Sequence, residues 1–371
     1  MNRIGSILLL ALLPFAALSL CAQEIDGNNG IAWAGGVTAV YQVADDDRVD
    51  PELTASADLF ITIPRTAGEW LIYIEGSTSP DKNGVSAVYP TANADAGSVL
   101  NEDDDGGIQI SELNYTFRLK DDRSLMVGLI NPSAWLDRSR IANDENNYYL
   151  NGSFKNNATI DFPDYTFGSV FRWPGSKSRP EVSLVISSSD GKADLPDRSY
   201  QDLLKLTADE RGAFLGIGAS WLRDSTSLRV GAWLRSDDHA VAGNPDDSEK
   251  NYGVYGVLGW QRAANAVNIR LGLANEDVSV ATRFAAIAYQ REIRSGLLGI
   301  GVARTVIANN FRQGDLENTS AAEVFYRIPL GQDNGHITPS FQYVENPGFD
   351  ASGSTASSSA VVAGVRFHWA F

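Results

Sequence analysis

Short segments in which hydrophobic and polar residues alternate follow one another along most of the chain, from about residue 31 onward. Alternation with a period of two is typical of β-strands that present one face to an apolar medium and the other to water. Sixteen such segments can be delimited, an even number, as a single-chain bacterial membrane barrel requires. They cover residues 31–43, 53–63, 69–77, 107–119, 124–130, part of 163–173, 181–189, 212–222, 227–236, 252–261, 266–274, 281–291, 297–305, 321–330, 337–344 and 360–371.

The connections between these segments alternate in length. Every second connection is tight, for example residues 64–68, 120–123 and 223–226, whereas most of the others are long and rich in Asn, Asp, Ser and Gly. Residues 275–279 form the one short connection of the second set. Membrane barrels combine short periplasmic turns with long outer loops. The sequence therefore predicts an all-β protein, a transmembrane antiparallel β-barrel of about sixteen strands, and not a soluble sandwich.

The last segment shows its two faces clearly. Positions 361, 363, 365, 367, 369 and 371 carry Val, Ala, Val, Phe, Trp and Phe, while Arg366 and His368 lie between them. We expect the first set to face lipid and the second set to face an aqueous lumen. By resemblance to outer-membrane proteins as a class, the terminal Phe371 is the expected signal to the barrel-assembly machinery.

The N-terminal residues predict export to the outer membrane of a Gram-negative bacterium. Arg3 supplies a positive charge, residues 7–20 are mainly apolar, and the small residue Ala22 precedes a polar stretch. This is the plan of a secretory signal peptide. We therefore expect residues 1–22 to be a signal peptide and residues 23–371 to form the barrel.

Two other interpretations of the N-terminus are weaker. A membrane anchor needs a longer apolar run than this one, which Pro14 interrupts. A lipoprotein would be attached at Cys21, the only cysteine, but the bulky Leu20 precedes it where processing favours a small residue. Cleavage after Ala22 leaves a mature chain without cysteine, which excludes a disulfide framework and thiolate metal sites.

The amino-acid composition is compatible with a barrel, and it reduces the number of possible binding partners. Mean hydropathy is -0.17 and 43% of the residues are hydrophobic, which suits a barrel because only alternate residues of each strand face lipid. The formal net charge of -16 argues against nucleic acid as a partner. The three histidines, His239, His336 and His368, are not expected to converge with an outer-face serine, so we expect no enzyme activity and no cofactor.

Three segments resemble the carbohydrate-selective porins of the OprB type. They are residues 127–132 before the third outer loop, residues 156–170 where that loop returns to the wall, and residues 337–348, which follow the family's P-x-x-Q-Y-x-x-x-P-G pattern. The resemblance implies a sixteen-strand porin for the passive diffusion of mono- or oligosaccharides. Many members carry an additional segment before the barrel, whereas only residues 23–30 precede the first strand here, which leaves no basis for a plug or tether.

The predicted pore constriction is the long connection at residues 131–160, because a sixteen-strand barrel leaves an aqueous channel that something must narrow. Aromatic rings can stack on the C–H faces of a sugar, while charged and amide groups hydrogen-bond its hydroxyls. Strand phase places further charged side chains on the lumen wall opposite the loop. The candidate residues are Trp135, Asp137, Arg138, Arg140, Tyr148 and Tyr149 in the loop, with Glu112, Arg118, Trp233, Arg235, Arg270, Glu323 and Arg327 on the wall.

Several alternatives stay open. The arginines could act as an ion filter, which would make the protein a general or anion-preferring porin, or the pore could be blocked in a structural or adhesive barrel. A homotrimer is compatible with this size, and the outer wall is expected to contact outer-membrane lipid. Asn101, Asp103, Asp105 and Glu112 have the spacing of a calcium loop, but no helix is expected on either side, so a solvated acidic loop is favoured and no metal is expected.

Overall fold

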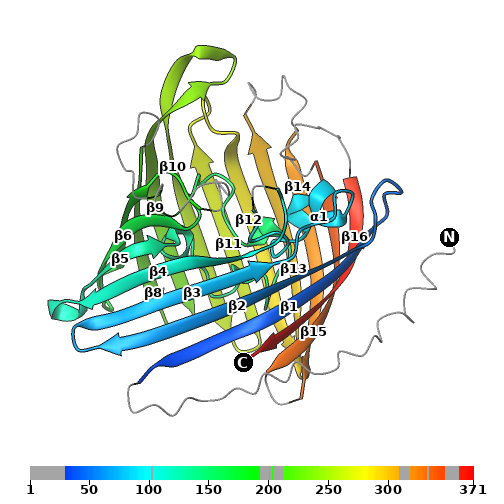
Figure 1. Ribbon diagram of the computed structural model, residues 1–371, viewed down its shortest axis with the longest axis horizontal. Helices are drawn as coiled ribbons and strands as arrows, with labels where there is room; N and C mark the ends of the chain where they lie inside the picture. The colour runs from blue at the N-terminus through cyan, green and yellow to red at the C-terminus, as the bar shows by residue number, and fades with distance from the viewer. Residues whose placement is uncertain are drawn as a thin grey trace.

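The computed structural model describes residues 30–101, 103–192, 200, 203, 212–308, 317–331, 334–346 and 359–371. In these residues sixteen strands close into one antiparallel barrel in which each strand pairs with its neighbours in sequence and β1 pairs with β16 (Figure 1). This confirms the predicted fold class. The signal peptide expected at residues 1–22 lies outside the described residues and stays a prediction.

The strands of the first half are β1 (Ala32–Ala44), β2 (Glu52–Arg65), β3 (Gly68–Ser77), β4 (Ile108–Arg118), β5 (Ser124–Ile130), β6 (Thr166–Trp173), β7 (Glu181–Ser188) and β8 (Ala213–Arg223). Those of the second half are β9 (Thr226–Val241), β10 (Asn244–Arg262), β11 (Asn265–Ala274), β12 (Ala281–Ile293), β13 (Gly296–Ile307), β14 (Thr319–Leu330), β15 (Gly335–Glu345) and β16 (Ser359–Ala370). The helices are short: α1 (Val85–Val88) and the 3-10 turns η2 (Pro90–Ala92), η3 (Lys120–Asp122), η4 (Pro132–Ala134) and η5 (Gly152–Phe154). Across the described ranges, none is long and apolar enough to cross a membrane.

Burial alternates along the strands and identifies the two faces of the wall. In β16 the side chains of Val362, Arg366 and His368 are buried, whereas Val365 and Trp369 are exposed. Arg366 donates hydrogen bonds to the carbonyl groups of residues 145 and 148 inside the barrel, and Val362 belongs to a buried apolar cluster with Val85 and Tyr89. The exposed set is apolar, as a lipid-facing surface must be. The faces predicted from the sequence of the last segment are therefore confirmed.

The turns that the sequence predicts to be tight all lie at one end of the barrel, which is also the end that carries the C-terminus. Four of them have two residues. Three of these four begin with Asp224, Ala263 and Arg294, whose φ values are 44°, 52° and 57°. Positive φ at this position is typical of hairpin turns whose twist matches that of the strands. By the asymmetry of membrane barrels, this is the periplasmic end.

One outer connection differs from the prediction. Residues 237–251 were expected to form an irregular acidic loop, but β9 and β10 continue through them and leave only residues 242–243 between the strands. The extension has two register shifts, and Lys250 pairs with Asp238 across it at 2.7 Å. A hairpin that rises beyond the membrane has water on both faces, so it lacks the apolar alternation by which the other strands were recognised.

Candidate functional site

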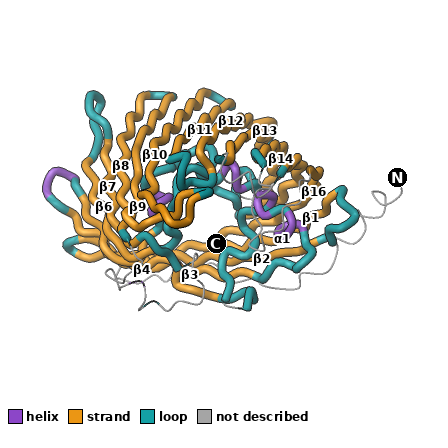
Figure 2. Tube along the Cα trace, turned by 90° about the horizontal axis from the view of Figure 1, so that it is seen from above, coloured by secondary structure: helices purple, strands orange, loops and turns teal. Residues whose placement is uncertain are grey.

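Two outer connections bind the inner wall of the barrel, and they define the candidate site. The second loop is residues 78–107 between β3 and β4, and the third loop is residues 131–165 between β5 and β6. Figure 2 shows loop and helix segments inside the ring of strands. Both loops hydrogen-bond to inward-facing side chains, so the geometry of the lumen depends on these contacts.

The third loop begins with a capped turn that packs on the wall. The Oδ1 of Asn131 accepts hydrogen bonds from the backbone N–H of Ser133 at 3.0 Å and from its hydroxyl at 2.8 Å, which fixes the start of η4. Leu136 then enters an apolar cluster with Phe214, Trp233 and Tyr255 from the wall, and Trp135 packs against this cluster. The first turn of the loop is therefore anchored mainly by apolar burial.

Four arginines of the wall, which we call the arginine anchors, donate hydrogen bonds to backbone carbonyl groups of the third loop. Arg229 binds the carbonyl of residue 135 at 2.6 Å and Arg327 that of residue 147 at 3.0 Å. Arg366 binds the carbonyl groups of residues 145 and 148, the second at 2.8 Å. Arg270 binds those of residues 154 and 155 at 2.6 and 2.8 Å. Charge-assisted bonds of this kind are stronger than those between neutral groups.

The wall also provides a hydrogen-bond acceptor for the third loop, the carboxylate of Glu323. The two carboxylate oxygens of Glu323 accept hydrogen bonds from the backbone N–H groups of Leu150 and Asn151, at 3.0 and 2.8 Å. The side chain of Asn151 continues to Gln342 at 2.9 Å. Wall donors and a wall acceptor therefore satisfy backbone groups of the loop that would otherwise be buried without partners.

Aromatic packing holds the same part of the loop. Tyr149 and Phe154 form a cluster with Phe325, with ring centroids 4.7 and 5.0 Å from that of Tyr149. The Tyr149 hydroxyl donates to the carbonyl of residue 300 at 3.0 Å. The glycine at position 301 makes this approach feasible, because a Cβ there would lie 2.6 Å from the Phe154 ring.

The second loop was not predicted to contribute to the lumen. Glu52 of β2 accepts hydrogen bonds from the N–H of Ser86 at 2.7 Å and from that of Asp81 at 2.9 Å. Gln42 and Gln342 both donate to the carbonyl of residue 92, at 3.0 and 2.8 Å. The apolar residues Val85, Tyr89 and Ala92 are buried. Their presence in a loop rich in Asn, Asp, Ser and Gly was the sequence signal that could have identified this contact.

The two loops also bind each other, and one buried carboxyl secures the second loop to the wall. The N–H of residue 94 donates to the carbonyl of Leu150 at 2.9 Å. The hydroxyl of Ser56 donates to both carboxylate oxygens of Asp95 at 2.7 and 2.9 Å. Burial raises the pKa of Asp95 to about 7, although the hydrogen bond from Ser56 opposes this shift.

The inward face of β2–β4, which we call the open wall, carries many polar groups, and among them Asp58 and Glu112 stay partly exposed. The Tyr73 hydroxyl donates to Asp58 at 2.7 Å, and the amide of Asn146 from the third loop reaches the same carboxylate at 3.2 Å. Glu75 accepts a hydrogen bond from Ser111 at 2.5 Å. Glu112, a predicted site residue, lies on this face and is partly exposed.

One aromatic residue of the open wall, Phe60, was not among the predicted site residues. Phe60 lies at an inward position of β2, stacked on Tyr73 with the ring centroids 4.2 Å apart and the planes 7° from parallel. It is 38% exposed, while the Tyr73 ring also meets Tyr165 edge-on at 6.1 Å. The signal was present in the sequence, because Phe60 interrupts a polar inward face formed by Glu52, Thr54, Ser56 and Asp58.

The predicted site residues of the loop are in three different environments. Asp137 is buried beside Arg270, with an N–O separation of 3.6 Å, and Tyr149 is buried in the aromatic cluster. Tyr148 is half-buried under the guanidinium of Arg327, whose central carbon lies 5.6 Å from the ring centroid. Trp135 is partly buried, and only Arg138 and Arg140 are exposed.

The predicted wall residues are also distributed over different places. Trp233, Arg270 and Glu323 are buried beneath the third loop, with exposures of 3%, 1% and 2%. Arg118 lies at the turn end of β4, mostly exposed and paired with Glu69 at 3.2 Å. These four residues therefore do not converge on a single site.

Arg235 belongs to a separate polar cluster near the outer hairpin. Its guanidinium contacts Asp161 of the third loop at 3.0 Å and Asp237 at 2.8 Å. His239 lies 3.4 Å from the same Asp161 carboxylate. This cluster joins the returning end of the third loop to the extension of β9.

The calcium spacing gains no support from the structure. The Oδ1 of Asn101 accepts hydrogen bonds from the N–H groups of Asp103 and Asp105, both at 2.9 Å. Glu112 lies in β4, hydrogen-bonded to Asn114 at 3.2 Å. Within the described ranges, no group of three or more His, Cys, Asp or Glu side chains could hold a metal ion.

Comparison with known proteins agrees with this architecture. A structure of Pseudomonas putida OprB at high pH superimposes with a TM-score of 0.73 over 92% of this chain and 94% of the other, at 12% identity. OmpT of Vibrio cholerae, folded in vitro, gives a TM-score of 0.57 over 92% and 97% at 10% identity. Such low identities establish only the fold, and no curated protein matches the sequence.

The family is established by the sequence itself. Residues 82–371 match the family described as carbohydrate-selective porin, OprB family. The match covers most of the second loop, the whole third loop and all strands from β4 onward. The match agrees with the resemblance in residues 127–132, 156–170 and 337–348. This chain is therefore a member of the OprB family of carbohydrate-selective porins, a non-enzymatic channel of the Gram-negative outer membrane.

Proposed function

We propose that small sugars cross the barrel by passive diffusion between the third loop and the open wall, and that Phe60 is the surface on which they stack. A barrel of sixteen strands is wide enough for an aqueous channel. The third loop occupies the part of the lumen next to β8–β16, and the second loop covers the outer part of β2 through Glu52 and Ser56. The route that they leave runs along β2–β4.

The observation that carries the proposal is the exposure of Phe60 on a wall that is otherwise polar. Its ring is held in place by the Tyr73 ring behind it, so little conformational freedom is lost when a solute binds. A pyranose ring presents an apolar C–H face that suits an aromatic surface. We infer that Phe60, with Tyr73 and Tyr165 as supports, forms an aromatic stacking site.

Polar groups suitable for sugar hydroxyls lie on the open wall and on the third loop. Asp58 and Glu112 of the open wall can accept hydrogen bonds, and Asn146 of the third loop can both donate and accept. Lys155 and Glu145 form an ion pair of 2.6 Å on the loop and add a donor and an acceptor. The mixture of acceptors, donors and an aromatic face suits a neutral polyol.

The same contacts argue against the arginine filter of an anion-preferring porin. Arg229, Arg270, Arg327 and Arg366 are engaged by carbonyl groups of the third loop, and Arg270 and Arg366 are almost fully buried. A buried guanidinium cannot exchange its partners with passing ions without releasing the loop. Arg138 and Arg140 are the exposed cations of the third loop.

Single-channel conductance of the refolded barrel, titrated with glucose and maltooligosaccharides, tests the proposal. Phe60→Ala should weaken sugar-dependent block about three- to tenfold, because an aromatic contact contributes about 0.5–1.5 kcal/mol. Phe117→Ala is the matched control, since Phe117 is 41% exposed on the outer face of β4. Equal block in both variants and the wild type would rule out Phe60 as the stacking surface.

Export by the N-terminal signal peptide, recognition of Phe371 during assembly and a homotrimeric state remain predictions. Phe371 exchanges backbone hydrogen bonds with Gly35 at 2.9 and 3.0 Å, and its ring lies 5.8 Å from that of Trp33. These contacts support a role for the last residue in closing the seam between β1 and β16.

A further inference from the structure

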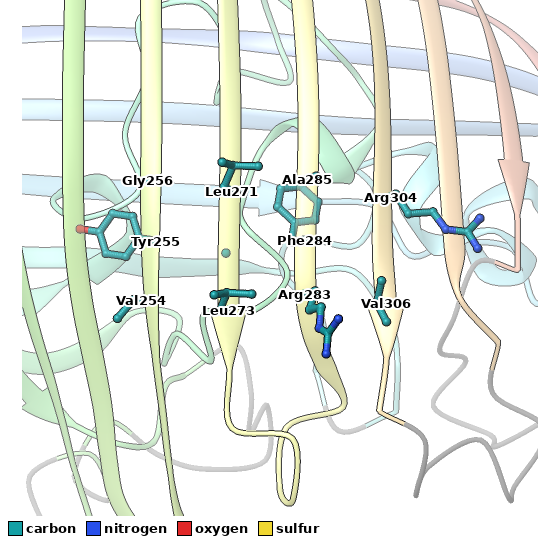
Figure 3. Close-up of a pocket in the computed structure, with 11 residues that line it drawn as sticks. Val254, Tyr255, Gly256, Leu271, Leu273, Arg283, Phe284, Ala285, Arg304 and Val306 are labelled. Atoms are coloured by element: carbon teal, nitrogen blue, oxygen red, sulfur yellow. The ribbon is translucent and has the colours of Figure 1, made fainter.

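A groove on the outer, lipid-facing wall is not explained by transport. It has a volume of about 400 Å³ and runs over β10–β13 (Figure 3). Its lining is largely apolar, and the side chains that project from it are exposed, with Leu271 at 55% and Leu273 at 54%. Its outward-facing apolar residues are Val254, Gly256, Leu271, Leu273, Ala285 and Val306, and Arg283 also lines it.

The groove exists because two outward positions lack bulky side chains. Gly256 lies on β10 between the outward-facing Val254 and Leu258, and Ala285 of β12 contributes only a methyl group. A Cβ built on Gly256 would meet nothing nearer than a backbone oxygen at 3.9 Å. The hollow is therefore a gap in the apolar surface that a larger side chain would fill without a clash.

An arginine stands at the extracellular end of the groove. Arg283 and Arg291 both face outward from β12, and the positions between them on this face are Ala285, Ile287 and Tyr289. Eight residues rise about 27 Å along a strand, or about 21 Å in height at a tilt of about 40°. This is close to the apolar band of about 25 Å, so Arg283 lies near the outer lipid interface and Arg291 near the inner one.

The partner that Arg283 has in the structure is easily exchanged. Arg283 pairs with Glu276 of the outer connection at 2.7 Å, but both side chains are more than 60% exposed. Exposed ion pairs contribute little to stability, whereas an arginine can bind a phosphate group through two parallel hydrogen bonds. Arg304 points away from the groove toward Glu345, at 3.3 Å, and Ser320 (Figure 3).

We propose that this groove binds one acyl chain of a phosphorylated glycolipid of the outer leaflet, with a phosphate group of that lipid held by Arg283. The apolar lining fits a hydrocarbon chain, and the cation at the outer interface fits an anionic headgroup. The position of Arg283 near the outer interface and its positive charge therefore both favour an anionic lipid of the outer leaflet. The site lies on the opposite face of the wall from the sugar route.

Native mass spectrometry can test the proposal by measuring how much lipid A the full-length barrel retains after detergent extraction. Lipid A is the probe for the phosphorylated glycolipid. Gly256→Leu fills the groove and Arg283→Gln removes the cation, and each should lower retained lipid A at least fivefold. The controls are Ala57→Leu on the exposed outer face of β2 and Arg291→Gln at the other end of β12, which should retain wild-type amounts. Sugar block and conductance should stay unchanged in all four variants.

Three outcomes would overturn the proposal. The first is equal retention of lipid A in all four variants. The second is equal retention of phosphatidylglycerol and lipid A by the wild type, which would mean that the groove takes any anionic lipid. The third is a barrel-to-barrel cross-link across β11 and β12 that excludes lipid, which would assign this face to a second copy of the chain.

Discussion

The two sides of the lumen use similar polar residues in different ways. On the wall formed by β8–β16, which we call the anchored wall, Arg270 and Glu323 bind backbone groups of the third loop and are almost fully buried. On the open wall, Asp58 and Glu112 stay partly exposed beside Phe60. The anchored wall therefore shapes the channel, and the open wall is left to contact what passes through it.

The largest effect is expected from removing an arginine anchor. Arg270→Ala removes the hydrogen bonds to the carbonyl groups of residues 154 and 155 and the cation beside the buried Asp137. Breaking a buried pair costs about 3–5 kcal/mol. We expect the third loop to detach, so that single-channel conductance rises and sugar block disappears. Arg118→Ala, at an exposed ion pair, is the control and should conduct like the wild type. Wild-type conductance in Arg270→Ala would show that the anchors do not set the channel width.

A smaller effect is expected at the acidic anchor. Glu323→Ala leaves the N–H groups of Leu150 and Asn151 unpaired, at a cost of about 1–3 kcal/mol for each buried group. Hydrogen exchange at these two amides should accelerate, and current noise from loop movement should increase. Glu323→Gln keeps one acceptor oxygen, so its rate of hydrogen exchange should lie between those of the wild type and Glu323→Ala. Exchange that is as slow in Glu323→Ala as in the wild type would contradict this assignment.

The contact between the second loop and the wall should depend on pH. The pKa of Asp95 is raised from 3.8 to about 7, so the folded barrel holds this proton more tightly than an unfolded chain does. The contact is then most stable below about pH 4, weakens as the pH rises through 7, and changes little above that. Proteolysis of the second loop should be faster at pH 8 than at pH 5, and Asp95→Asn should abolish the difference. Equal rates of proteolysis in the wild type at pH 5 and pH 8 would show that ionisation of Asp95 does not control this contact.

The smallest effect is expected at the exposed arginines of the third loop. Arg138→Ala and Arg140→Ala remove side chains that are exposed, and such substitutions change stability by less than about 0.5 kcal/mol. Conductance and sugar block should stay near wild type, and the reversal potential in a salt gradient should shift slightly toward cations. A large shift of the reversal potential in the alanine variants, together with wild-type values in Arg138→Lys and Arg140→Lys, would support the ion-filter interpretation. The arginines of the third loop would then contact passing solutes, as the open wall is proposed to do.

The fold was accessible from the sequence because lipid and water impose a period of two on each strand. That rule identified all sixteen strands and the inward orientation of Arg270, Glu323 and Arg366. It failed only in residues 237–251, where water lies on both faces and the pattern disappears. Hydrophobic alternation therefore predicts the membrane-embedded part of a strand better than its extension.

The site was less accessible, for a different physical reason. The arginine anchors bind backbone carbonyl groups, which every residue possesses, so nothing in residues 131–165 marks where Arg229 or Arg327 will bind. Strand phase alone accordingly predicts that Arg270 and Trp233 contact the solute, although both are buried beneath the loop. Phe60 could have been found, because it is the one apolar side chain among the inward positions 52, 54, 56, 58 and 60 of β2.

Anchoring through carbonyl groups has an evolutionary consequence. Because the arginine anchors recognise the path of the backbone, exposed side chains of the third loop can be exchanged with little effect on how the loop is held. Mutations that introduce new aromatic or polar side chains at the exposed positions 138 and 140 can therefore add contacts with solutes while the scaffold is inherited intact. A directed-evolution library restricted to those positions should contain mostly folded barrels, which makes this loop a practical starting point for channels with new preferences.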